Sequence, residues 1–110
     1  MPLVGVIMGS ASDEPLVQDT VTTLEQMRID YEIRVMSAHR TPERVREYGL
    51  TARERGLELL IGVAGAAAAL PGVLASWTTL PVIGVPATSS DLQGLDALYS
   101  IVQMPPGIPV

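Results

Sequence analysis

The chain has 110 residues, enough to bury one hydrophobic core and too few for two ordinary domains, so we expect a single domain over residues 1–110. Its 12 acidic and 7 basic residues give a formal charge of −5, which offers no electrostatic footprint for nucleic acid or for an anionic membrane. The basic residues are all Arg and there is no Cys, which excludes lysine Schiff-base chemistry, disulfides and thiolate metal sites.

The first predicted strand–helix unit begins at residue 3. Residues 3–8 form a short apolar run that ends at Gly9, which is typical of a parallel strand covered on both faces. Ser12 or Asp13 can then cap a helix whose apolar stripe has helical spacing: Val17, Val21 and Leu24. The start of the chain has neither the basic region nor the cleavage pattern of a signal peptide, so we expect a cytoplasmic protein.

The second predicted unit begins with a strand over residues 31–36, where apolar and polar residues alternate. Thr41 is a good N-cap and Pro42 suits the first helical position, so a helix should follow and end at Gly56. Its inner face is predicted to consist of Val45, Tyr48 and Ala52.

Residues 59–90 carry no charge and exceed the roughly 20 residues that a membrane-spanning helix needs. The Gly and Pro residues spread through this stretch argue against one continuous helix. We therefore predict no membrane span, but a strand over 57–63, an apolar helix over 70–77 and a strand over 81–85. A last helix is predicted over 91–103, with an inward face formed by Leu95, Leu98, Tyr99 and Val102.

Four strand–helix units without hairpin signals predict a parallel, doubly wound α/β sheet. Residues 104–110 look like a loop that leads into a fifth strand, so we expect the chain to lack that strand. Ligands of such sheets bind outside the carboxyl ends of the strands, where loops lead into helix N-termini. Three loops should meet there: residues 9–13, 37–42 and 64–71.

The first of these loops can bind an anion together with a sugar hydroxyl. It offers Ser10, Ser12 and Asp13 beside the backbone N–H groups of a helix N-terminus. The alternative is that Ser12 and Asp13 only cap the helix, as both residue types commonly do.

The second loop contains the one histidine of the chain, His39, followed by Arg40. Imidazole exchanges protons readily near neutral pH, which makes His39 a candidate general acid or base. Arg40 is a candidate for bidentate binding of phosphate. The alternatives are a partly buried histidine bonded to backbone and an arginine that covers a helix terminus.

The third loop, from Ala64 to Gly72, consists mostly of small residues that would let a ligand approach the backbone closely. Tight packing of a helix on the sheet is the alternative explanation, and the loop matches neither the dinucleotide nor the P-loop fingerprint. One His and no Cys leave no metal-binding constellation, and no Gly-x-Ser-x-Gly elbow accompanies His39. We therefore expect no metal and no other cofactor.

Taken together, these motifs resemble the PurE family, the N5-carboxyaminoimidazole ribonucleotide mutases of bacterial purine synthesis. The matching segments run almost from end to end of the chain: Met8-Gly9-Ser10-x-Ser12-Asp13, Ser37-Ala38-His39-Arg40-Thr41-Pro42, Leu70-Pro71-Gly72, Pro81-Val82-Ile83-Gly84-Val85-Pro86, and Ser100 to Val110.

The resemblance implies a three-layer, flavodoxin-like (Rossmann-like) fold and a homo-octamer. It also implies an enzyme that moves a carboxyl group of a ribonucleotide from an exocyclic nitrogen to ring carbon 4, without metal or ATP, through release and recapture of carbon dioxide. By the same resemblance His39 handles the proton, and the substrate-binding residues are Ser10, Ser12, Asp13, Ser37, Ala38, Arg40, Ala64, Gly65, Ala66, Ala69 and Leu70.

Two features depart from the family's pattern. Ala66 and Ala69 stand where a second Gly and a second active-site His are expected, and the chain ends at Val110, where family members continue through another strand and long helices. We therefore expect a C-terminally short form, which is either an incomplete sequence or a shortened relative. The alternatives to a mutase are a catalytically impaired nucleotide-binding relative, a carboxylase that uses free carbon dioxide, and a subunit that joins a full-length homologue.

Overall fold

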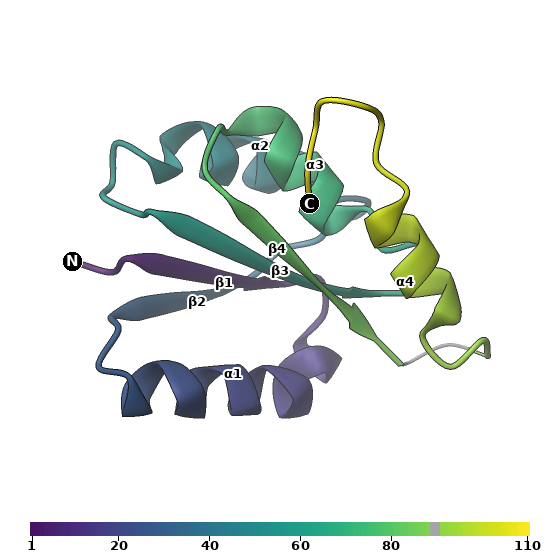
Figure 1. Ribbon diagram of the computed structural model, residues 1–110, viewed down its shortest axis with the longest axis horizontal. Coiled ribbons are helices and arrows are strands. Elements are labelled where there is room, and N and C mark those ends of the chain that lie inside the picture. Colours follow the sequence, from purple (N-terminus) through teal and green to yellow (C-terminus); the bar gives the residue numbers. More distant parts are fainter. Residues whose placement is uncertain (89–90) are drawn as a thin grey trace.

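The computed structural model describes residues 1–88 and 91–110 and contains one parallel sheet with the strand order β2-β1-β3-β4 (Figure 1). The strands span Val4–Met8 (β1), Tyr31–Val35 (β2), Leu59–Gly65 (β3) and Val82–Ala87 (β4). β1 pairs with both β2 and β3, and β3 pairs with β4. The chain thus has the flavodoxin-like α/β architecture that its strand–helix alternation and its resemblance predict.

The helices lie on both faces of this sheet. A short 3₁₀ turn, η1 (Ala11–Asp13), leads into α1 (Glu14–Gln26), which covers one face alone, whereas α2 (Pro42–Ala52), α3 (Leu70–Trp77) and α4 (Leu95–Val102) lie on the other side (Figure 1). The predicted helix over 70–77 is confirmed, and the helix that begins at Pro42 is confirmed in its start but ends at Ala52, before the predicted stop at Gly56. The predicted strands differ from the observed ones by one or two residues at their ends.

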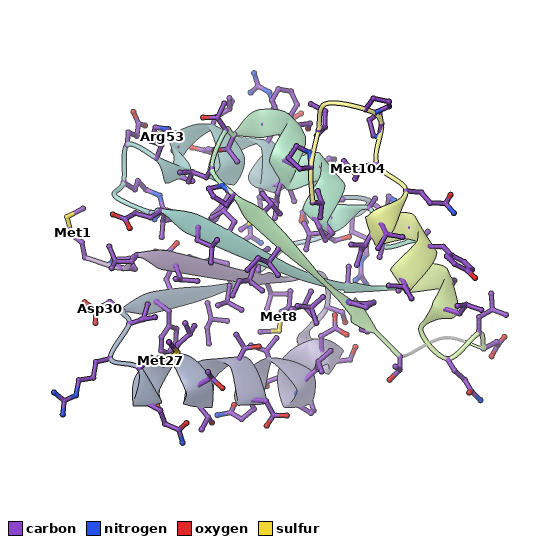
Figure 2. The ribbon with its side chains drawn as sticks, viewed as in Figure 1. Met1, Met8, Met27, Asp30, Arg53 and Met104 are labelled. Atoms are coloured by element: carbon purple, nitrogen blue, oxygen red, sulfur yellow. The ribbon has the colours of Figure 1, made fainter. Side chains whose placement is uncertain are left out.

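Each face of the sheet has its own hydrophobic core. On the α1 side, the predicted stripe of Val17, Val21 and Leu24 is buried against β1 and β3, and Figure 2 shows Met8 in the same layer, between β1 and α1. On the other side, the predicted inner face of α2 is buried with residues of all four strand–helix units, among them Ile7, Leu60, Leu74 and Ile101. The sheet is therefore covered on both faces at β1 and β3, which explains why these strands are continuously apolar.

Two adjacent glycines bring α3 and α4 close to the sheet. Gly62 on β3 is paired with Gly84 on β4. A Cβ at Gly62 would lie 3.2 Å from Cγ of Pro71, and one at Gly84 would overlap the side chain of Ile101. The absence of side chains here lets the first turn of α3 rest on the strands, which holds the loop before α3 against the carboxyl end of β3.

The uncharged stretch from residue 59 forms β3, α3 and β4, as predicted, and its last two residues, 89–90, lie outside the described part of the chain. Among the helices of residues 1–88 and 91–110, none has the length and apolar character needed to cross a membrane.

The predicted last helix is wrong in its start and in its orientation. It begins at Leu95 instead of residue 91, because Gln93 and Gly94 have left-handed backbone conformations, with φ of 56° and 89°. Its buried residues are Ala97 and Ile101, while the residues predicted to face inward are 41 to 56 % exposed: Leu95, Leu98, Tyr99 and Val102. The small side chain of Ala97 and the gap at Gly84 admit this face to the sheet, so the bulkier face points outward.

Candidate active site

A cavity of about 560 Å³ lies at the carboxyl ends of β1, β2 and β3, where three loops meet. The helices that follow β1 and β3 leave toward opposite faces of the sheet, so the cavity occupies the crevice where doubly wound sheets bind ligands (Figure 1). Its lining contains every residue that the sequence places in the site: Ser10, Ser12, Asp13, Ser37, Ala38, His39, Arg40, Ala64, Gly65, Ala66, Ala69 and Leu70.

The loop after β1 is held by its own serines. Ser10 and Ser12 are joined by a hydrogen bond of 2.8 Å between their hydroxyls, and the Ser10 hydroxyl accepts a bond from the backbone N–H of Ser12. The expectation that Ser12 or Asp13 caps the helix with its side chain is wrong. Asp13 occupies the N-cap position of α1 but makes no side-chain cap bond, and it is Ser10 that caps the 3₁₀ turn. The side chains of Ser12 and Asp13 therefore do not bond to the start of α1, and both line the cavity.

Asp13 is the one buried charged side chain among the described residues, with 7 % of its surface exposed. Burial raises the pKa of its carboxyl above the ordinary value, and a hydrogen bond from the Ser10 backbone partly opposes this effect. A buried carboxylate at the wall of a cavity is a strong acceptor for hydroxyl donors such as those of a sugar.

The loop after β2 brings His39 and Arg40 to the cavity. His39 is exposed, and no described residue bonds its imidazole, so the alternative of a partly buried histidine bonded to backbone through its side chain is wrong. Its backbone N–H donates to the Ser37 hydroxyl. Arg40 lines the cavity and donates through Nη2 to the Gly9 carbonyl at 2.9 Å, which ties the second loop to the first.

The loop after β3 forms an apolar wall made of small residues. Ala64 and Ala68 are buried, whereas Ala66 and Ala67 are exposed, and Ala66 has a left-handed backbone with φ of 51°. Backbone N–H groups of Ala68 and Ala69 donate to Ala66 and Ala67 within the loop. Ala69, where the resemblance led us to expect a second imidazole, is partly exposed and lines the cavity, so His39 is the one imidazole there.

A larger cavity of about 880 Å³ lies near the amino end of β4, away from these loops. Residues of α2, α3 and the C-terminal segment line it, and its one charged side chain, Arg53, already donates to the Thr79 hydroxyl at 2.6 Å. The lining of this larger cavity offers no candidate acid, base or nucleophile beyond hydroxyls. The smaller cavity is therefore the better candidate for the active site, although its volume is less. Over residues 1–88 and 91–110, no three His, Cys, Asp or Glu side chains lie together as metal ligands would.

Two contributions to the site were missed from the sequence. Gly9 supplies the carbonyl that holds Arg40, and Thr41 bonds to Ser37 instead of capping α2. The position of Gly9 at the carboxyl end of a buried strand is the sequence signal that could have indicated its bond to Arg40. The second has no local signal, because Thr before Pro is also a common start of a helix.

Comparisons with known proteins identify the family of this chain. The family model for AIR carboxylase matches residues 3–110. The chain is 62 % identical over 110 residues to N5-carboxyaminoimidazole ribonucleotide mutase of Pyrococcus abyssi, and 59 % identical over 110 residues to that of Thermotoga maritima. In each case the whole chain is covered, but it spans only 63 % and 64 % of the relative's length.

A solved structure shows the same fold. The crystal structure of Treponema denticola PurE superposes with a TM-score of 0.83 at 36 % sequence identity, and the match covers 100 % of this chain and 70 % of that one. Because the family match extends over nearly every residue and includes all three loops of the cavity, this chain belongs to the AIR carboxylase family, the family of PurE.

Proposed function

We propose that this chain carries the active site of an N5-carboxyaminoimidazole ribonucleotide mutase of purine biosynthesis, an isomerase. The observation that carries the proposal is the exposed imidazole of His39, which no described residue engages and which lies in a cavity with Arg40 and Asp13. The names of the relatives from Pyrococcus abyssi and Thermotoga maritima support the same activity.

The proposed reaction needs one group that both gives and takes a proton. Protonated His39 gives its proton to the exocyclic nitrogen as the bond from that nitrogen to the carboxyl carbon breaks and carbon dioxide leaves. Ring carbon 4 then attacks the trapped carbon dioxide, and His39 removes the proton from that carbon. One proton is given and one is taken, so the balance requires no cofactor.

The rest of the cavity suits the substrate proposed. Arg40 has guanidinium donors beyond the one that Gly9 uses, and with Ser37 and the hydroxyls of Ser10 and Ser12 they can hold a phosphate. Asp13 can accept from ribose hydroxyls. The small residues between Ala64 and Ala69 let the ring and the carbon dioxide lie against backbone, and Ala38 and Leu70 add apolar surface that excludes water.

The proposal extends to a homo-octamer in the cytoplasm, as the resemblance implies. Exposed apolar residues on α4, namely Leu95, Leu98, Tyr99 and Val102, support burial of this helix against other subunits.

The direct test follows conversion of the N-carboxylated ribonucleotide into its ring-carboxylated isomer. Wild-type protein should accelerate it above the uncatalysed rate, and His39→Asn should reduce kcat by about 100-fold or more, the usual contribution of general acid–base catalysis. Binding of aminoimidazole ribonucleotide, measured by calorimetry, should stay within about threefold of wild type, because Asn keeps the polarity of the loop and leaves the phosphate contacts intact. Activity of His39→Asn close to wild type would show that His39 is not the proton carrier.

Ala69 favours one alternative, a nucleotide-binding protein without turnover, because a second imidazole is absent there. Binding of the ribonucleotide without product formation in the same assays would support it. Product formed only from aminoimidazole ribonucleotide and carbon dioxide would indicate a carboxylase instead. Ala69→His is the matched variant: if the missing imidazole limits the rate, the variant should be faster than wild type.

A further inference from the structure

The hydroxyl of Thr41 bonds to the turn that precedes it instead of to its own helix. Its Oγ1 accepts the backbone N–H of Ser37 at 2.9 Å and donates to the Ser37 carbonyl at 3.2 Å. The backbone N–H of Thr41 donates to the same carbonyl at 2.9 Å. Three hydrogen bonds therefore join the two ends of the segment 37–41, in which His39 is the middle residue.

The same segment is also held from inside. The hydroxyl of Ser37 accepts the backbone N–H groups of His39 at 3.2 Å and of Arg40 at 3.0 Å. Thr41 bonds to both the backbone N–H and the carbonyl of Ser37. It therefore holds Ser37 where its hydroxyl can accept from the backbone N–H groups of His39 and Arg40. The imidazole of His39 has no side-chain partner among the described residues, so its position depends on this backbone turn.

Helix capping does not account for the Thr41 side chain. Thr41 is the N-cap residue of α2 but makes no side-chain cap bond. The first hydrogen bonds of α2 run from the backbone N–H groups of Arg44 and Val45 to the Thr41 carbonyl, and neither involves the Thr41 hydroxyl. Loss of the hydroxyl should therefore loosen the turn and leave the start of α2 in place.

We propose that Thr41 is a positioning residue for His39, acting through Ser37 on the backbone that presents the imidazole to the cavity. The inference rests on the proposed mutase function for its consequence in catalysis, but the positioning itself can be measured without substrate. Proton transfer depends steeply on geometry, and displacement of a reacting group by about 1 Å can cost about 100-fold in rate. The hydrogen bonds between Ser10 and Ser12 in the loop after β1 do not involve Thr41.

The test compares Thr41→Val, which removes the hydroxyl at nearly constant shape, with Thr41→Ser, which retains it. Thr51→Val is the matched control, because the Thr51 hydroxyl also bonds to backbone in α2, at 2.9 Å from the Glu47 carbonyl, and lies outside the cavity lining. In mutase assays Thr41→Val should lower kcat by about 10- to 100-fold and raise KM by a smaller factor, because the Arg40 side chain stays tied to the Gly9 carbonyl. Thr41→Ser and Thr51→Val should stay within about threefold of wild type in both constants.

The single histidine supplies a second readout, since a proton–carbon NMR spectrum contains one imidazole Cε1–Hε1 signal. At one fixed pH the signal of Thr41→Val should shift or broaden, while the signals of Thr41→Ser and Thr51→Val should coincide with wild type. If Thr41→Val does not fold by circular dichroism, Thr41→Ala takes its place and Thr41→Ser remains the rescue.

The two readouts separate failure of this inference from failure of the proposed function. A shifted signal in Thr41→Val with an inactive wild type supports positioning and rejects the mutase. An active wild type whose Thr41→Val variant keeps both its kcat and its imidazole signal overturns the inference and leaves the mutase standing.

Discussion

Ala66 is the residue at which the backbone of the candidate site is most constrained. Its φ of 51° lies in the left-handed region, which costs an L-residue with a Cβ roughly 1–2 kcal/mol, and it lies in the loop that closes the cavity after β3. Arg28 and Gln93 share the left-handed conformation but lie outside the cavity lining. Strain at a position that lines a cavity is consistent with a loop shaped for a ligand.

We expect Ala66→Gly to stabilise the fold. Glycine adopts this φ without strain, although its freer unfolded chain offsets part of the gain, so the free energy of unfolding should rise by up to about 1 kcal/mol. Ala67 is the matched control, because it is also exposed but has no positive φ, and Ala67→Gly should destabilise. Urea unfolding of both variants measures the difference; equal destabilisation by the two would show that Ala66 is not strained.

At the scale of elements, β2 and α2 are joined by a polar cluster at the end of the sheet opposite the cavity. The hydroxyl of buried Tyr48 on α2 donates to Glu32 on β2 at 2.7 Å. This hydroxyl lies against Gly5 of β1, where a Cβ would overlap it. Arg55 donates from Nη1 and Nη2 to the two oxygens of the same carboxylate and stacks on the Tyr48 ring. This cluster helps to orient α2, and with it the turn that carries His39.

The cluster predicts a pH-dependent contribution to stability. The guanidinium of Arg55, with the Tyr48 hydroxyl, holds the pKa of Glu32 below its ordinary value of 4.5. Because the folded state favours the charged form, the stabilisation is fully present above the ordinary pKa and is lost as the pH falls below it. Glu32→Gln should therefore lower the free energy of unfolding by about 1–3 kcal/mol at pH 7, and by less at pH 3.5.

Urea unfolding at the two pH values checks this expectation. Glu25→Gln is the control, since Glu25 also accepts a tyrosine hydroxyl, that of Tyr31, but at the exposed surface, and it should have a much smaller effect. A loss in Glu32→Gln that stays the same at both pH values would argue against an ionised Glu32 as its source.

At the scale of the whole molecule, the sheet is covered unevenly. α1 covers one face alone (Figure 1). Ile83 on β4 pairs with Ile61, which lies in the core on the α1 side, and Ile83 is 47 % exposed. The outer face of α4 presents Leu95, Leu98, Tyr99 and Val102 at helical spacing. A contiguous apolar face of this kind on a helix is characteristic of a surface that another subunit covers.

We expect Leu98→Asp, in the middle of this face, to weaken self-association, because a charge would be buried in an apolar contact. Sedimentation velocity should show a smaller species than wild type at the same concentration. Leu16→Asp on α1 changes a similarly exposed leucine that lies on another helix and should leave the sedimentation coefficient unchanged. Dissociation by both variants alike would place the interface elsewhere.

The fold and the site loops follow from the sequence because both depend on local patterns. Apolar runs of strand length, stripes at helical spacing and the residues Pro42 and Gly9 at element ends define the strand–helix units. Once the units are parallel, the carboxyl ends of the strands share one edge, so Ser10, His39 and Ala69 meet there although they are distant in sequence.

The tertiary structure alone decided which face of α4 is inward and what the polar groups near His39 bind. Both faces of α4 are apolar, and the choice depends on Ile101 meeting the gap at Gly84, a contact between elements. The bond from Arg40 to the Gly9 carbonyl joins residues that are 31 positions apart. The hydroxyl of Thr41 could have bonded either to its own helix or to the preceding turn, both of which are close in sequence, and it bonds to the turn. Periodicity specifies elements, but hydrogen-bond partners and the face that a helix turns inward depend on three-dimensional neighbours, which no local pattern encodes.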